Sequence, residues 1–217
     1  PVDYARKLEA FCREHDIVLI MDEVQAGFGR TGKFWCFEHY GIVPDLIACG
    51  KGISSSLPLS AVIGRNDIME LYAPGSMTST HSASPLPVAA AIESLKIIDR
   101  ESLVAHAAAM GEIMVPELHR IRRRFPAVLG CATGKGLVAG IQVVKPNSHI
   151  PNPDLAQRIN VRCFQKGLLM FAPVGVAGEC LKIAPPLTIA ETALREAIEV
   201  FETAIEEVTQ GGGECSP

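Results

Sequence analysis

The chain has 217 residues with 20 basic and 24 acidic side chains, and its formal net charge of −4 argues against a general nucleic-acid-binding protein. Hydrophobic residues make up 48% of the sequence, which is more than a disordered chain carries and enough to form a sizeable core. There is no run of about 18 apolar residues, so we expect no membrane-spanning helix and no membrane partner.

Three short apolar runs predict strands in the first part of the chain, after an amphipathic helix over residues 3–15. The runs are residues 17–21, 46–49 and 61–63. Runs of this kind suit strands of a mainly parallel sheet that helices cover on both faces. The alternation with helical and irregular segments therefore predicts an α/β fold, in which ligands bind at the carboxyl ends of the strands.

Further along, the sequence predicts a polar loop and then a second, smaller α+β domain. The loop covers residues 73–84, and two helices are expected over residues 85–98 and 101–125. Beyond them we expect strands at residues 137–144, 168–171 and 181–184 and a helix at residues 154–166. A last helix is expected behind the capping-box pattern of residues 188–191, with one apolar stripe from residue 194 to residue 208. The resulting domain prediction is a larger domain over residues 1–99, a smaller domain over residues 100–210 and a disordered tail over residues 211–217.

Cysteine and histidine usage bears on compartment and on metal binding. The seven cysteines contain no C-x-x-C pair, and their odd number is typical of reduced thiols in a cytoplasmic protein. The six histidines show no clustered spacing, so no metal site is expected. The sequence opens at Pro1 without a methionine and without a signal peptide, and we expect it to be part of a longer chain.

The candidate chemistry lies at the ends of the first two predicted strands. Asp22 and Glu23 follow the first strand, and Lys51 follows the second, between Gly50 and Gly52. Partial burial of Lys51 would lower its pKa and supply the neutral amine that imine formation needs. A carboxylate at Asp22 could hold a pyridine nitrogen protonated, so that the ring acts as an electron sink between Asp22 and Lys51.

Another interpretation of an acidic pair after an apolar strand is the Mg²⁺-binding strand end of a P-loop ATPase. That interpretation requires the phosphate-binding sequence G-x-x-x-x-G-K-[ST]. Gly32-Lys33 is followed by Phe34, and Gly50-Lys51 is followed by Gly52, so neither pair completes the motif. The ATPase is therefore strongly disfavoured.

The motif residues resemble a known family. Residues 22–32 (Asp-Glu-Val-Gln-Ala-Gly-Phe-Gly-Arg-Thr-Gly), Pro44-Asp45-Leu46, Gly50-Lys51-Gly52 and Pro185-Pro186-Leu187-Thr188 resemble the class III pyridoxal-phosphate aminotransferases. This family includes the 4-aminobutyrate and other ω-amino acid aminotransferases. The resemblance implies a fold-type I transferase, of which the chain would supply the C-terminal part of the large domain and the small domain, with pyridoxal 5′-phosphate as cofactor.

The resemblance also implies a role for individual residues. Asp22 would pair with the pyridine nitrogen, Val24 would pack on one face of the ring, and Gln25 would hydrogen-bond the phenolic oxygen. Lys51 would form the Schiff base and then carry a proton between the substrate α-carbon and the cofactor C4′. Thr80 would reach the cofactor phosphate of the neighbouring subunit in a homodimer. Glu23 we interpret as orienting the neighbouring backbone.

One substrate-binding position departs from the family pattern. Lys182 stands where many relatives have an arginine that clamps the substrate carboxylate with two parallel hydrogen bonds, a contact that lysine cannot reproduce. Lys182 can still attract a carboxylate as a point charge, but the resemblance then no longer implies the usual preference for 2-oxoglutarate.

These observations predict an aminotransferase that moves an amino group from an amino acid or amine to a 2-oxo acid by a ping-pong mechanism. Two alternatives stay open: an amino-acid racemase or epimerase that uses the same Lys51, and an inactive chain that only associates with a partner. The sequence does not identify the donor or the acceptor. We expect the isolated chain to be a poorly stable or aggregation-prone fragment with little or no activity.

Overall fold

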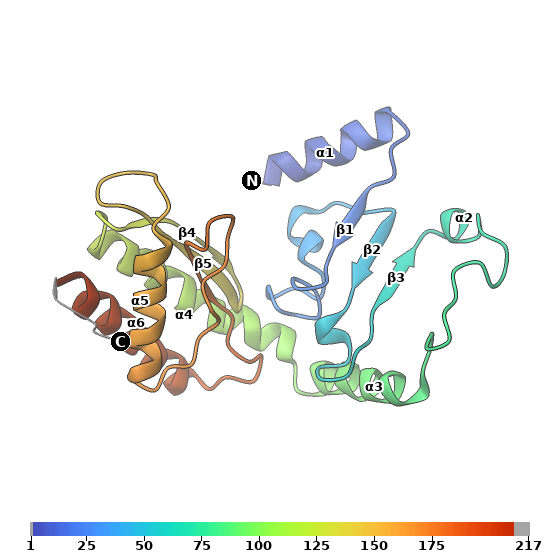
Figure 1. The fold of residues 1–217 in the computed structure, drawn as a ribbon. Helices are drawn as coiled ribbons and strands as arrows, with labels where there is room; N and C mark the ends of the chain where they lie inside the picture. The colour runs from blue at the N-terminus through green and yellow to red at the C-terminus, as the bar shows by residue number, and fades with distance from the viewer. Residues whose placement is uncertain (1, 211–217) are drawn as a thin grey trace. The chain divides into compact units, whose positions relative to one another are not determined.

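The computed structural model describes residues 2–210, and the chain divides into two compact units, residues 1–106 and 107–217 (Figure 1). Each unit is described by itself below. The expected domain limits at residues 99 and 100 stay a prediction, and the predicted disordered tail, residues 211–217, lies outside the described residues.

The first unit contains a three-stranded sheet in the order β1-β2-β3. β1 (Ile20–Asp22) is parallel to β2 (Leu46–Cys49), and β2 is antiparallel to β3 (Ala61–Gly64), so the part of the sheet in this chain is mixed. The other elements are the helices α1 (Val2–Glu14), α2 (Asn66–Met69) and α3 (Pro85–Arg100) and the 3₁₀ helices η1 (Cys36–Tyr40) and η2 (Lys51–Ile53). Figure 1 shows α1 at one end of the strands and α3 at the other.

Asp45 anchors the start of β2, at the end of the sheet where α1 lies. Its buried carboxylate accepts hydrogen bonds from Arg13 at 2.6 Å, from Arg65 at 2.8 Å and from the backbone N–H of Leu19 at 2.8 Å. The Leu19 amide and the two guanidinium groups lower the pKa of Asp45 to about 2. One side chain thus joins α1, the start of β1, and the residue that follows β3.

The strand predicted at residues 17–21 is shorter than expected and begins at Ile20. The N–H of Ile17 bonds to the carbonyl of Cys12 at 2.8 Å and so completes the end of α1, whereas the first bond toward β2 uses the carbonyl of Leu19. Residues 17 and 18 therefore connect a helix to a strand. The expectation of strands buried on both faces is also wrong for the described residues, because Ile20 is 58% exposed and Val62 is 55% exposed.

The second unit contains an antiparallel sheet in the order β4-β5-β6 and three long helices, the first of which begins at Leu103, just before the boundary between the units. The strands are β4 (Leu129–Lys135), β5 (Val138–Val143) and β6 (Cys180–Ile183), and the helices are α4 (Leu103–Arg124), α5 (Pro153–Gln165) and α6 (Glu191–Gln210). All six elements contribute side chains to one hydrophobic core. Among them are the apolar residues predicted along α6, of which Leu194, Ile198, Phe201 and Ile205 are buried.

Two strand predictions in this unit need correction. Residues 168–171 form no strand: Leu168 and Met170 pack against the core, but the segment lies in no ladder of the described residues. β4 was not predicted, because Gly130 and Gly134 interrupt its apolar pattern and an irregularity in the register lies between Leu129 and Ala132.

None of the helices within residues 2–210 combines the length and the apolar character of a membrane span. In the same part of the chain, no three His, Cys, Asp or Glu side chains gather where a metal ion could be held.

Candidate active site

The parallel pairing of β1 and β2 brings the two chemically important segments to the same edge of the sheet. Asp22, the last residue of β1, lies opposite Ala48 of β2, and the next amide, that of Glu23, donates to the carbonyl of Ala48 at 2.8 Å. β2 ends at Cys49, so Lys51 follows two residues later, at the same end of the sheet. In an α/β sheet this is the edge at which ligands bind.

The Asp22 carboxylate is exposed at this edge and is oriented by its own backbone. One of its oxygens accepts a hydrogen bond from the N–H of Val24 at 3.0 Å. This contact fixes the turn after β1, and the remaining lone pairs face solvent and can accept a further donor. Asp22 is therefore available as an acceptor for a protonated ring nitrogen.

Lys51 adopts a backbone conformation that is unusual for a residue with a side chain. Its φ of 41° lies in the left-handed region, which costs on the order of 1 kcal/mol or more and is often found at functional sites. The expected partial burial is wrong for this chain, because the Lys51 side chain is exposed at the open end of the sheet. What distinguishes Lys51 in the structure is thus its left-handed backbone conformation and not burial of its side chain.

The two glycines that flank Lys51 lie against the loop that follows β1. A Cβ atom at Gly50 would lie 3.6 Å from Val24 Cγ1, an ordinary contact, whereas a Cβ atom at Gly52 would lie 3.3 Å from Phe28. The absence of a side chain at Gly52 thus makes room for Phe28. The contacts of Val24 and Phe28 bring the loop after β1 and the Lys51 turn together.

Ser94 also holds the Lys51 turn, and the only sequence signal for this role is one serine in an alanine-rich helix. The Ser94 hydroxyl on α3 donates to the carbonyl of Gly52 at 3.4 Å and lies 3.0 Å from the Ser55 hydroxyl. Helix α3 therefore supports the segment that carries Lys51.

Glu23 points away from solvent and binds backbone amides, as predicted. Its carboxylate is 1% exposed and accepts hydrogen bonds from the N–H groups of Cys36 and Phe37, both at 2.9 Å. Burial raises the pKa of Glu23, and the two amides partly oppose that effect. Glu23 thus shapes the loop that carries Val24 and Gln25.

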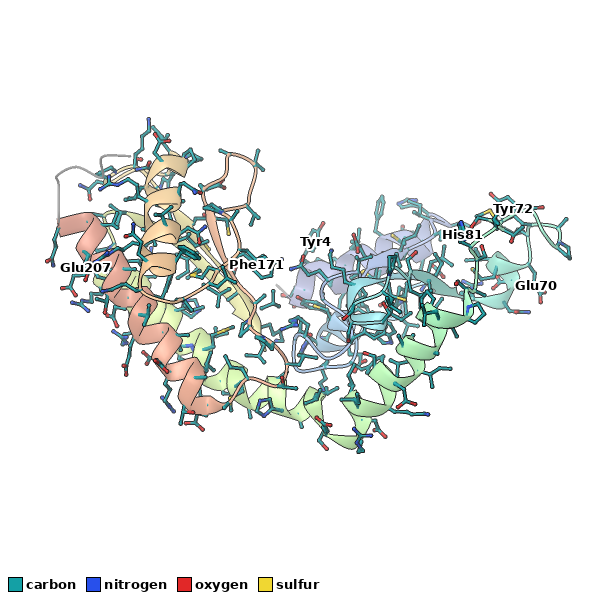
Figure 2. All side chains as sticks on the ribbon, turned by 60° about the horizontal axis from the view of Figure 1, so that its bottom comes forward. Tyr4, Glu70, Tyr72, His81, Phe171 and Glu207 are labelled. Carbon is teal, nitrogen blue, oxygen red and sulfur yellow. The ribbon has the colours of Figure 1, made fainter. Side chains whose placement is uncertain are left out.

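Gln25 and Thr80 are exposed residues of the first unit. Gln25 lies three residues after Asp22, on the loop already described. Thr80 lies in the long exposed loop between α2 and α3, the same loop that carries Tyr72 and His81 (Figure 2). The serines on either side of Thr80 form a turn in which the N–H of Ser79 donates to the Ser82 hydroxyl at 2.9 Å. The cofactor-binding roles of Gln25 and Thr80 remain predictions.

Lys182 belongs to the second unit, where it lies on β6 opposite Gly140. Its ammonium nitrogen lies 4.5 Å from the centroid of the Phe171 ring, which is the geometry of a cation–π contact. This contact holds the Lys182 head on an aromatic face. The predicted contact of Lys182 with a substrate carboxylate remains a prediction.

The residues at the sheet edge fit pyridoxal 5′-phosphate in their chemistry. They supply a carboxylate for the ring nitrogen (Asp22), an apolar side chain beside it (Val24), an amide for a polar ring substituent (Gln25) and a primary amine (Lys51). Three of them, Asp22, Val24 and Lys51, lie on segments that the structure brings side by side.

Comparisons with known proteins agree with this chemistry. The family model "Aminotransferase class-III" matches residues 1–205. The chain is 38% identical over 211 residues to a protein named alanine/serine racemase from Pyrococcus horikoshii, covering 97% of the chain and 44% of that protein. It is 35% identical over 203 residues to a probable 4-aminobutyrate aminotransferase from Bacillus subtilis, covering 93% of the chain and 46% of that protein.

A solved structure shows the same fold. A transaminase from the marine bacterium Virgibacillus superposes with a TM-score of 0.89 at 26% sequence identity, over 98% of this chain and 50% of that chain. The chain thus spans about half the length of the relatives that it matches. The match over residues 1–205 places the chain in the class III aminotransferase family, whose enzymes depend on pyridoxal 5′-phosphate.

Proposed function

We propose that this protein is an aminotransferase that moves an amino group from an amino acid or an amine to a 2-oxo acid. The observation that carries the proposal is the position of Asp22 and Lys51 at the ends of two paired parallel strands within the matched region. An acceptor for a ring nitrogen and a primary amine at one sheet edge are the two groups that this chemistry needs from the protein.

When bound, pyridoxal 5′-phosphate supplies an electrophilic carbon and an electron-withdrawing ring that stabilises negative charge at the substrate α-carbon. Asp22 would keep the ring nitrogen protonated, and Val24 and Gln25 would orient the ring. Lys51 would hold the cofactor through its amine and would move a proton at the substrate α-carbon. The exposed position of Lys51 at the end of β2 gives the side chain room for both tasks.

The proposal includes a cytoplasmic homodimer with shared active sites. Thr80 lies on an exposed loop rich in hydroxyl groups, and the loop also carries exposed apolar side chains such as Leu71 and Met77, 76% and 78% exposed. A surface of this composition suits contact with a second subunit. In that dimer Thr80 supplies a hydroxyl to the neighbouring subunit's cofactor phosphate.

Lys182 is our candidate for the substrate carboxylate. Held over the Phe171 ring, its ammonium group attracts a carboxylate as a point charge and not through a bidentate contact. The acceptor preference therefore need not follow that of relatives with an arginine at this position.

A half-reaction assay tests the proposed activity. The complete protein, loaded with pyridoxal 5′-phosphate and mixed with a panel of α- and ω-amino acids without any acceptor, should release the matching oxo acid in a stoichiometric amount. Addition of 2-oxoglutarate or pyruvate should then allow turnover with ping-pong kinetics. Absence of oxo acid across the panel would contradict aminotransfer.

A second candidate is an amino-acid racemase or epimerase, since the relative at 38% identity is named alanine/serine racemase. Such an enzyme would use the same Lys51 to move a proton without transferring the amino group. Loss of optical rotation without oxo-acid formation identifies it. If neither product forms, the remaining reading is a chain that acts only by association with a partner.

A further inference from the structure

We propose that Glu23 is a positioning residue for Lys51. Its carboxylate closes the segment from Glu23 to Phe37 into one fixed loop, and this loop packs against the turn that carries Lys51. The proposal deepens the proposed function, on which it rests only for the chemical role of Lys51. The contacts that carry it lie within the first unit.

We call the two hydrogen bonds from the N–H groups of Cys36 and Phe37 to the Glu23 carboxylate the clasp. They join residues that are 13 and 14 positions apart in sequence. Each oxygen of the buried Glu23 carboxylate accepts one backbone N–H at 2.9 Å, one from Cys36 and one from Phe37, at the start of η1. Hydrogen bonds between a carboxylate and backbone amides are among the stronger ones in proteins. The two ends of the loop are therefore held together at a single buried point.

Inside the clasp the loop is packed without spare room. A Cβ atom at Gly27 would lie 2.8 Å from both the Glu23 carbonyl oxygen and the Trp35 ring, so this position requires glycine. Phe28 is 4% exposed and lies 5.1 Å from Trp35 and 5.7 Å from Phe34, measured between ring centroids. The position of Phe28 is thus set by the closed loop.

Phe28 transmits this position to Lys51. Its side chain lies where a Cβ atom at Gly52 would be only 3.3 Å away, and Gly52 is the residue after Lys51. Lys51 is itself in the left-handed region with φ 41°, a conformation that persists only when its surroundings hold it. Release of the clasp lets Phe28 move, and the strained Lys51 turn then relaxes.

The negative charge of Glu23 does not stabilise the folded protein. Burial raises the pKa of Glu23, so ionisation makes the folded state less stable as the pH rises through the unfolded and folded pKa values. The buried carboxylate of Asp45 shows the opposite behaviour, with a lowered pKa. An ionised carboxylate next to Asp22 that lowers the stability of the fold is consistent with a role in the active site.

The experiment compares Glu23→Gln with the unchanged protein, in the complete protein without cofactor. Glutamine has one acceptor oxygen in place of two and sets an NH₂ group against a backbone N–H. The rate of acetylation of Lys51 by acetic anhydride, measured by mass spectrometry relative to Lys96, should change several-fold. Hydrogen exchange over residues 24–37 should accelerate in the same variant.

Two controls separate positioning from general loss of stability. Glu38→Gln removes the charge of an exposed side chain on the same 3₁₀ helix, which accepts the Trp35 N–H at 2.9 Å, and Asp45→Asn weakens the opposite end of the sheet. Both should leave Lys51 acetylation unchanged. Gly52→Ala, whose added methyl group displaces Phe28, should reproduce the effect of Glu23→Gln and serves if that variant does not fold.

In the loaded protein, Glu23→Gln should also shift the pH midpoint of the cofactor's visible absorbance and lower kcat more than it raises KM. Unchanged acetylation of Lys51 in both Glu23→Gln and Gly52→Ala, or an equal change in Asp45→Asn, would overturn the proposal. Changed acetylation in a protein that shows no aminotransfer would instead support the positioning and contradict the proposed function.

Discussion

Asp22 is the residue whose charge matters most to the proposed chemistry. In Asp22→Asn the neutral amide no longer holds a proton on the ring nitrogen, so we expect turnover to fall about 10²-fold or more, by analogy with loss of other electrostatic stabilisers. Covalent attachment at Lys51 should persist. Steady-state kinetics and mass spectrometry measure the two effects, with Asp67→Asn as a surface control. Turnover unchanged in Asp22→Asn would remove Asp22 from the mechanism.

Asp45 makes a second residue-level prediction, on stability. Its pKa of about 2 lies below its ordinary value, so its contribution is fully present above pH 4 and is lost as the pH falls toward 2. Because both arginine partners are partly exposed, we expect Asp45→Asn to lower the free energy of unfolding by roughly 1–2 kcal/mol at pH 7. Hydrogen exchange of the β1 and β2 amides in urea measures this change. An equal stability of variant and unchanged protein at pH 7 would contradict it.

The sequence predicted the chemistry of these residues better than their surroundings. The order of Asp22 and Lys51 after two apolar runs was enough to place both at one sheet edge, because parallel strands end together. The exposure of Lys51 and the contact between Phe28 and Gly52 depend on packing between distant segments. Such packing between distant segments cannot be predicted from the types of the side chains alone.

Helices α4 and α6 are joined by a carboxylate that binds two arginines. Glu202 on α6 accepts hydrogen bonds from Arg120 and Arg124 on α4, the latter at 2.7 Å, and its side chain is 11% exposed. The hydrogen bond from Arg120 is the largest cause that lowers the pKa of Glu202 to about 2. The basic end of α4 is thus partly used to bind α6.

Glu202→Gln should therefore lower the free energy of unfolding of the second unit by roughly 2 kcal/mol at pH 7, a value reduced from the full pKa shift because both arginines are partly exposed. This difference should vanish as the pH falls from 4.5 toward 2, since the Glu202 pKa is lowered in the folded state. Denaturant titrations at several pH values test it. The matched control is Glu207→Gln, also on α6 (Figure 2), a more exposed carboxylate whose ion pairs with Arg162 and Lys166 should contribute much less. Equal effects of the two variants would contradict the prediction.

Elements with a continuous apolar pattern were predictable, and elements without one were not. The strand at Leu46–Cys49 and the helix that begins at Pro85 lie where the sequence places them. β4 was not predictable, because its two glycines and the irregular register interrupt the alternation of apolar and polar residues along the strand. Residues 168–171 have the composition of a strand, but β6 pairs with β5 and leaves them without a ladder in the described residues.

At the scale of the whole molecule, the chain exposes many large apolar side chains. Those in the first unit include Ile20, Val62, Leu71, Tyr72 and Met77, each more than half exposed. Exposed apolar surface of this extent usually marks an interface. We therefore expect residues 1–217, produced alone, to self-associate, to bind little cofactor and to show little or no turnover.

Size-exclusion chromatography with light scattering tests this expectation, and replacement of Leu71 and Met77 by glutamate should reduce the association. A monodisperse, active monomer would contradict it. The sequence could predict the two kinds of fold in the chain, because the α/β and α+β patterns differ, but it carries no pattern that shows which apolar surfaces stay uncovered.

The most direct test of the whole account is to find which lysine the cofactor binds. The complete protein, loaded with pyridoxal 5′-phosphate, is reduced with borohydride, digested and mapped by mass spectrometry, with Lys51→Ala as the control. We predict that the cofactor mass is attached to Lys51 and that Lys51→Ala loses both the attachment and the visible absorbance. Attachment at a different lysine, or full absorbance and turnover in Lys51→Ala, would contradict the account.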